Sequence, residues 1–320
     1  MSASTTIVVD DLHLPSSDGR HTIAAKMWKV AAMSRPRGIV QIVHGMEEHI
    51  GRYDDFARFL ASRGWAVVGH DQLGHGDTCP PGERGVFDPK RGRDQLLADI
   101  HAVRLYAAGT MPPALAHFVF GHSMGSYLTR AYLARHASGL SGAVLCGTGH
   151  VAPIVSRAGN LLARGICAVR GPAHKSALLA SLCTGAFARR VSKTDDLAWI
   201  SADEGNIARY RADGACGFGF AASGYAVLTD ITREACSTET LWRVPRDIPL
   251  LFIAGEGDPV GDMGAGVERS AREARTAGIK DVEVKVYAGM RHEILNEADH
   301  GKVYADVATW LDRRLAAQGS

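Results

Sequence analysis

The chain alternates short apolar runs with stretches in which apolar residues recur every three or four positions. Apolar runs bounded by turn residues predict strands, at residues 6–14, 21–30, 38–45, 65–71, 117–123, 142–148, 248–254 and 282–287. Helical spacing predicts helices between these runs, at residues 54–63, 94–108, 124–136, 267–278 and 303–317. Strands that alternate with helices are typical of parallel βαβ units, so the pattern predicts a doubly wound, mostly parallel α/β sheet.

The alternation stops between residues 151 and 236. This segment is rich in alanine, glycine and arginine, has helical spacing and contains no strong strand run. Because the alternation resumes afterwards, an insertion explains the pattern better than two sequential domains do. We therefore expect a core formed by residues 1–150 and 237–320, with a helical cap formed by residues 151–236.

Composition narrows the function classes. Of 320 residues, 46% are hydrophobic and 22% are charged, as in ordinary globular proteins. The net charge of +2, without a block of lysine and arginine, argues against nucleic acid as a partner. The six cysteines are scattered without a CxxC pair, so we expect no metal and no other cofactor, and buried thiols in a cytoplasmic protein. No run has the length and apolarity of a membrane span or a secretory signal.

A candidate nucleophile lies in the pentapeptide Gly-His-Ser-Met-Gly at residues 121–125, which fits GxSxG. The pentapeptide alone is a weak signal, but here it directly follows a buried strand and opens a helix, as a nucleophile elbow requires. The turn is so tight that side chains two residues to either side would collide, which explains glycine at both positions. The sequence therefore predicts Ser123 as the nucleophile.

A serine hydroxyl needs a base, and the base needs an orienting acid. Behind an elbow of this kind the chain order is serine, acid, histidine. The segment after the next strand, residues 146–150, has no carboxylate, whereas Asp258 follows the strand after that one and precedes a proline. We favour Asp258 over its neighbours Glu256 and Asp262. We favour His292 as the base over His300, because His300 begins the terminal helix, where capping or solvation would explain it.

Acyl transfer also needs donors for the oxyanion of the tetrahedral intermediate. The elbow positions the backbone N–H of Met124 at a helix N-terminus. A second N–H should come from the loop after the strand at residues 38–45, and Met46 is the best candidate because Gly45 lets the backbone turn there. An ordinary connection between strand and helix would be the alternative for this loop.

Five blocks of sequence resemble one known group of enzymes. They are HGMEEHIGRY (residues 44–53), DQLGHGDT (71–78), GHSMGS (121–126), GDPVGD (257–262) and GMRHEILNE (289–297). In this order they are similar to the monoacylglycerol lipase and lysophospholipase group of α/β-hydrolases, also described as serine aminopeptidase-like. The resemblance implies an eight-stranded α/β-hydrolase fold, the triad Ser123, Asp258 and His292, and oxyanion donors on Met46 and Met124. It also implies that the cap covers an acyl-chain pocket. From the hydrophobic helices of the cap we expect transient contact with a membrane or micelle.

Some residues of these blocks keep two interpretations. Glu48, His49, Arg52 and Tyr53 would bind a glycerol head group or brace the oxyanion loop. Asp71 and His75 are expected to hold a turn, and His122 to be packed. Met46 replaces the small residue of some relatives, which would narrow the pocket mouth.

Apolar cap residues would line an acyl tunnel or form a helical core: Leu161, Leu162, Ile166, Leu178, Leu179, Leu182 and Phe187.

The sequence thus predicts a serine hydrolase that cleaves carboxylic esters without a cofactor. Its expected substrate is a monoacylglycerol or a lysophospholipid, and the sequence does not indicate its oligomeric state. The alternatives are a small-ester carboxylesterase and, less favoured, an aminopeptidase. The cap carries acidic residues that would bind a substrate amine, but arginines surround them: Asp195, Asp196, Asp203 and Glu204. A non-catalytic binding protein is disfavoured because all three triad residue types stand in the expected order. Serine at position 123 argues against dehalogenases and epoxide hydrolases, which need aspartate there.

Overall fold

The computed structural model describes residues 6–31 and 33–318. Its centre is one sheet of eight strands in the order β1-β2-β4-β3-β5-β6-β7-β8. The strands are β1 (Ile7–Pro15), β2 (Thr22–Val30), β3 (Gly38–Val43), β4 (Ala66–His70), β5 (Ala116–His122), β6 (Gly142–Cys146), β7 (Leu250–Gly255) and β8 (Val282–Tyr287). Strands β3 to β8 pair in parallel, whereas β2 pairs antiparallel with both β1 and β4. The predicted mostly parallel sheet is confirmed.

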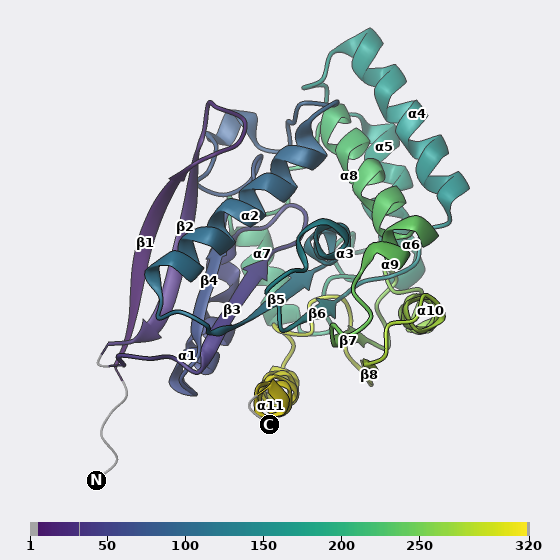
Figure 1. Cartoon of the computed structure of the whole chain (residues 1–320). Coiled ribbons are helices and arrows are strands. Elements are labelled where there is room, and N and C mark those ends of the chain that lie inside the picture. The colour runs from purple at the N-terminus through teal and green to yellow at the C-terminus, as the bar shows by residue number, and fades with distance from the viewer. Residues whose placement is uncertain (1–5, 32, 319–320) are drawn as a thin grey trace.

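Helices cover both faces of this sheet. Helices α2 (Gly92–Thr110), α3 (Met124–His136) and α10 (Ala265–Thr276) lie on one face, and α1 (Asp54–Ser62) and α11 (His300–Gln318) on the other (Figure 1). The strands β3, β5, β6 and β7 are buried almost completely because both of their faces are covered. Short 3₁₀ turns precede α1 and α2, at Ile50–Tyr53 and Pro81–Glu83.

Between β6 and β7 the chain forms helices only. They are α4 (Pro153–Arg170), α5 (Ala177–Leu182), α6 (Thr184–Val191), α7 (Glu204–Ala212), α8 (Ala222–Ala235) and α9 (Thr238–Arg243). We call the helices α4 to α8 with their connections the cap; α4, α5 and α8 rise beside the sheet at the upper right of Figure 1. In the part of the chain that the structure describes, no helix is long and apolar enough to cross a bilayer.

The parallel strands deliver several loops to one edge of the sheet. The loops after β3, β5, β7 and β8 all leave from the carboxyl ends of their strands, and the connection into the cap leaves from the end of β6. In open α/β sheets this edge is where ligands bind. The topology therefore brings together the loops that carry the residues singled out in the sequence.

Candidate active site

Ser123 lies at a sharp turn between β5 and α3. Its backbone has φ 51° and ψ −120°, a strained conformation for a residue other than glycine. The turn is held because the N–H of Ser123 donates to the carbonyl of Cys146 at 2.9 Å. Close packing explains the glycine two residues later, since a Cβ on Gly125 would lie 2.0 Å from the carbonyl oxygen of Val43. The strand, turn and helix expected of a nucleophile elbow are all present.

The loops after β7 and β8 bring Asp258 and His292 into contact. Nδ1 of His292 lies 2.9 Å from Oδ2 of Asp258, and both side chains are buried. The other carboxylate oxygen accepts the backbone N–H of Val260 at 2.9 Å, which fixes the orientation of the carboxylate. Burial alone would lower the pKa of His292, but the charge of Asp258 and its hydrogen bond outweigh burial, and the pKa is raised above 6.5.

The rival acids and the rival base lie elsewhere. Glu256 is exposed and accepts the N–H of Gly289, and Asp262 is exposed and pairs with Arg190 at 2.7 Å. His300 begins α11, and its Nδ1 is bonded to the carbonyl of Glu297 at 2.7 Å. Of the candidates weighed in the sequence, the structure therefore pairs only Asp258 with His292.

The imidazole of His292 also lies close to the elbow. Its ring centroid is 4.8 Å from that of His122, the residue before Ser123. Burial lowers the pKa of His122 far below its ordinary value, and the neighbouring His292 and Arg52 lower it further. His122 is thus a packed, neutral ring, with its Nδ1 3.4 Å from the sulfur of Cys146.

The loop after β3, at residues 44–49 and called the oxyanion loop after its predicted role, approaches Ser123 at Gly45. A Cβ on Gly45 would lie 2.6 Å from Oε1 of Glu48 and 3.1 Å from the Cβ of Ser123, so glycine lets the loop come this close without displacing its neighbours. Met46 follows directly and is half-buried, and Met124 begins α3. Among the described residues, no backbone–backbone hydrogen bond occupies the N–H of Met46 or of Met124. Both N–H groups therefore remain candidates for the predicted oxyanion donors.

Buried polar contacts brace this loop. The carboxylate of Glu48 accepts the N–H of Gly45 and the hydroxyl of Tyr53, the latter at 2.8 Å. Burial raises the pKa of Glu48, although the charge of Arg52 opposes the shift. The polar groups of Glu48 and Tyr53 thus already bond to other protein groups. This favours the interpretation that they brace the oxyanion loop over the one in which they bind a glycerol head group.

Arg52 belongs to a second buried network. Its guanidinium donates to Glu293 at 2.7 Å and to Asn206 of the cap at 3.0 Å, and Asn206 also donates to Glu293 at 2.7 Å. The side chains of Arg52 and Glu293 are only 8% and 6% exposed. Since Glu293 is the neighbour of His292, this network connects the oxyanion loop, the cap and the loop between β8 and α11, which carries His292 and which we call the histidine loop.

The cap docks directly on the oxyanion loop through Glu47. The carbonyl of Glu47 accepts from the hydroxyl of Tyr210 and the N–H of Gly217, each at 3.0 Å. Its carboxylate accepts the N–H of Phe220 at 2.9 Å. Glu47 itself adopts φ 57°, which costs roughly 1–2 kcal/mol for a residue with a side chain. These cap contacts offset that cost and hold the loop in position beside Ser123.

A second cap segment packs on the histidine loop. The ring of Trp199 lies 5.0 Å from that of His292, and the carbonyl of Ile200 accepts the N–H of Glu293 at 2.7 Å. Arg291 donates to the carbonyls of Ala198 and Ser201. The cap thus forms one wall around the imidazole.

Six of the seven apolar cap residues named above fall into two groups, and the seventh, Phe187, packs its ring 5.4 Å from that of Trp199. Leu161, Leu178 and Leu182 are exposed, so neither a buried tunnel nor a helical core describes them. Leu162, Ile166 and Leu179 pack on the cluster that also contains Met124. Asp71 keeps its expected role in a turn, because it accepts the N–H groups of Ile50 and Asp77, each at 2.8 Å.

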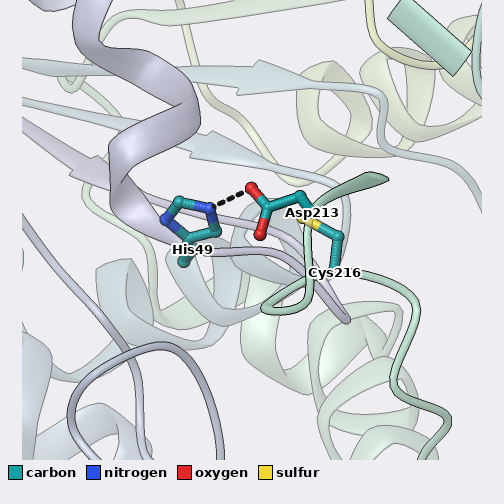
Figure 2. Close-up of side chains that lie close together, drawn as sticks. All are labelled: His49, Asp213 and Cys216. Atoms are coloured by element: carbon teal, nitrogen blue, oxygen red, sulfur yellow. Dashed lines mark hydrogen bonds and ion pairs between the residues drawn. The ribbon is translucent and has the colours of Figure 1, made fainter. Parts of the chain in front are cut away.

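Sequence reasoning missed Glu47, Asn206, Trp199 and Glu293. Glu47 and Glu293 carried a local signal, as the neighbours of the predicted donor Met46 and the predicted base His292. It also missed that side chains far apart in sequence form a possible metal-ligating group, made by His49, Asp213 and Cys216 (Figure 2).

Comparison with known proteins identifies relatives along nearly the whole chain. A family model described as "Serine aminopeptidase, S33" matches residues 34–299. The monoacylglycerol lipase of Mycolicibacterium smegmatis is 30% identical over 284 residues, which are 88% of this chain and 90% of that protein. The monoglyceride lipase of Mus musculus is 25% identical, over 96% of this chain and 92% of that protein.

Solved structures agree in fold. A highly thermostable carboxyl esterase from Bacillus coagulans, solved in complex with glycerol, superposes with a TM-score of 0.88 at 29% identity, covering 97% of this chain and 100% of the other. A soluble variant of the monoglyceride lipase of Saccharomyces cerevisiae has a TM-score of 0.75 at 20% identity and covers 98% of each chain, which shows a common fold.

Proposed function

Because this chain belongs to the family described as "Serine aminopeptidase, S33", within the α/β-hydrolases, and is an ester-hydrolysing enzyme, we propose that it works through a triad of Ser123, His292 and Asp258. The buried contact between His292 and Asp258, at the edge of the sheet where the elbow presents Ser123, carries this proposal. The raised pKa of His292 suits a base that must accept a proton from a hydroxyl group.

The mechanism follows from these positions. His292 takes the proton of Ser123 while the serine oxygen attacks the ester carbonyl, and Asp258 stabilises the imidazolium that forms. The N–H groups of Met46 and Met124 stabilise the oxyanion. His292 then protonates the leaving alcohol, leaving an acyl group on Ser123. Finally His292 activates water, which releases the carboxylic acid and restores the serine.

The proposed substrate is a monoacylglycerol or a lysophospholipid. The names of the relatives support this choice, since two proteins that match about nine-tenths of this chain are named as monoacylglycerol or monoglyceride lipases. The acyl chain would lie along half-buried apolar side chains from cap and core that pack on one cluster: Met46, Leu162, Ile166, Phe218 and Val260. Such a lining suits a long apolar chain better than a charged substrate.

We also propose transient contact of the cap with membranes or micelles. Helix α4 carries strongly exposed apolar side chains, which are Ile154, Val155, Leu161 and Val169 at 72%, 60%, 74% and 82%. Exposed apolar groups of this kind favour an interface where lipid substrates gather.

We expect the protein to act in the cytoplasm, since all six cysteines are free thiols.

A small-ester carboxylesterase is the second candidate, favoured by the esterase from Bacillus coagulans. An aminopeptidase is less well supported, because two of the four acidic cap residues named above, Asp195 and Asp203, already have partners. Asp195 pairs with Arg211 at 3.0 Å, and Asp203 accepts the N–H of Gly205. Both carboxylates would have to give up or share these contacts to bind a substrate amine.

Hydrolysis of p-nitrophenyl esters from acetate to palmitate, beside monooleoylglycerol and an aminoacyl anilide, tests these proposals. A maximum at medium or long acyl chains with release of glycerol is expected; activity confined to acetate and butyrate would favour the small-ester alternative. Ser123→Ala should lower kcat by about 10⁴-fold or more with an unchanged thermal midpoint. A folded Ser123→Ala variant that keeps most of the activity would contradict the triad.

A further inference from the structure

Three side chains with metal-binding atoms meet where the cap touches the oxyanion loop. His49 comes from the loop after β3, and Asp213 and Cys216 come from the cap loop after α7 (Figure 2). Nε2 of His49 lies 2.8 Å from Oδ2 of Asp213, and one ligand atom from each of the three residues lies within 4.8 Å of the others. These residues take no part in the proposed triad or oxyanion hole.

We propose that His49, Asp213 and Cys216 bind a divalent cation of the zinc class. An imidazole nitrogen, a carboxylate oxygen and a thiolate sulfur are the ligand types that zinc accepts, and this mixture would not suit magnesium or calcium, which prefer oxygen alone. The charge also balances, because an aspartate and a thiolate neutralise a divalent ion when the imidazole is neutral.

The distances require only small movements. Zinc–ligand bonds of about 2.0–2.3 Å at tetrahedral angles place ligand atoms roughly 3.3–3.6 Å apart. The contact between His49 and Asp213 would lengthen by about half an ångström from its 2.8 Å, and the widest pair would close by on the order of 1 Å. Side-chain rotation alone supplies shifts of this size.

Binding at Nε2 changes the hydrogen bonds of the imidazole. Nδ1 of His49 accepts the N–H of Gly51 at 3.2 Å, so the ring now carries its proton on Nε2, facing Asp213. A metal on Nε2 requires the other tautomer, with the proton on Nδ1. The cation therefore replaces one hydrogen bond to Asp213 by two metal bonds and gives up the long contact with Gly51.

The surroundings leave room for a further ligand. His49 and Asp213 line a cavity of about 500 Å³, whose wall also includes Asp54 and Asp203. Cys216 is buried. The guanidinium of Arg52 lies 3.9 Å from the sulfur of Cys216, but its positive charge is paired with the carboxylate of Glu293. A water molecule from the cavity would complete four-coordination, as at zinc sites that keep an open position.

Such a cation would fasten the cap to the core. Its ligands come from both sides of the junction, and Gly217, next to Cys216, donates its N–H to the carbonyl of Glu47 beside Met46. A ligand that binds only the folded protein raises its stability. We therefore expect the thermal midpoint to rise with the concentration of zinc.

Cobalt substitution tests the site directly. The full chain, freed of any polyhistidine tag and stripped with a chelator, is titrated with Co²⁺ and then with Zn²⁺ against a chromophoric competitor. We expect one ion per chain, a thiolate-to-cobalt charge-transfer band in the near ultraviolet, and loss of that band when Zn²⁺ displaces Co²⁺.

Variants assign the ligands. Cys216→Ser should abolish the band and weaken Zn²⁺ binding by at least about tenfold. Mutation of residues that only hydrogen-bond to metal ligands already weakens binding by about this factor, so loss of a ligand should cost no less. Asp213→Asn should weaken binding while the band persists. Cys167→Ser is the matched control, since Cys167 is a half-buried thiol outside this group, and it should bind like the unchanged chain. Absence of the band in the unchanged chain, or its persistence in Cys216→Ser, would overturn the proposal.

Discussion

Replacing Glu293 by glutamine removes one charge from a buried ion pair and leaves the shape of the side chain. In the unchanged protein the carboxylate lies 2.7 Å from the guanidinium of Arg52 and accepts the amide of Asn206 at the same distance. With an effective dielectric constant of about 20, two unit charges at this separation attract by about 6 kcal/mol. Desolvation cancels much of that attraction in the intact pair, but removal of one partner leaves the other charge buried and unpaired.

The expected loss in the free energy of unfolding is about 3 kcal/mol. Removing one partner of a buried pair typically costs 3–5 kcal/mol, and the lower end applies because the charge of Glu48 still acts on Arg52. Urea unfolding followed by tryptophan fluorescence measures the loss as a shift in midpoint at constant slope. The double variant Arg52→Met, Glu293→Leu should lose less than Glu293→Gln does, because it leaves neither charge unpaired.

Glu239 provides a matched control on the surface. It pairs with Arg243 one helical turn away in α9, but the two side chains are 76% and 62% exposed. Glu239→Gln should therefore change the free energy of unfolding by less than about 0.5 kcal/mol. A loss below about 1 kcal/mol for Glu293→Gln, close to that of the control, would refute the argument that Glu293 neutralises a buried arginine.

Three further changes address the active site. Asp258→Asn should lower kcat by about 10⁴-fold. The same change should move the acidic limb of the kcat/KM–pH profile to lower pH, because Asp258 raises the pKa of His292 and the base must be neutral to act. Gly125→Ala should destabilise the protein by about 3 kcal/mol or more, measured by thermal unfolding, since the new Cβ would lie 2.0 Å from the carbonyl oxygen of Val43. Trp199→Ala should lower kcat/KM about tenfold in ester hydrolysis, because it removes the ring packed 5.0 Å from the imidazole.

The glycine and tryptophan changes each have a matched control. Gly109→Ala adds a methyl group with no atom within 4 Å, in helix α2, and should be neutral or slightly stabilising. Trp242→Ala removes a ring that is 71% exposed and should leave kcat/KM unchanged. An unmoved acidic limb in Asp258→Asn, a stable Gly125→Ala protein, or equal kcat/KM values for the two tryptophan variants would contradict the respective argument.

The sequence by itself determined the sheet and the order of the proposed triad. Strands such as β3 and β7 are buried on both faces. Such a strand can be predicted from its own residues, because burial on both faces requires a short, continuous apolar run. The elbow could also be predicted, because its strained turn excludes side chains at fixed neighbouring positions and so imposes glycine there. Patterns of this kind depend on residues within a few positions of one another.

Only the tertiary structure decided which polar groups meet. Arg52 and Glu293 are 241 positions apart, and His49 and Asp213 are 164 apart. Nothing near either residue in sequence distinguishes a buried, paired charge from a solvated one, because burial depends on which loops the parallel strands bring to one edge. The same holds for the exposed leucines of the cap. Their helical spacing is that of a core face, and the spacing itself does not reveal that these side chains are exposed.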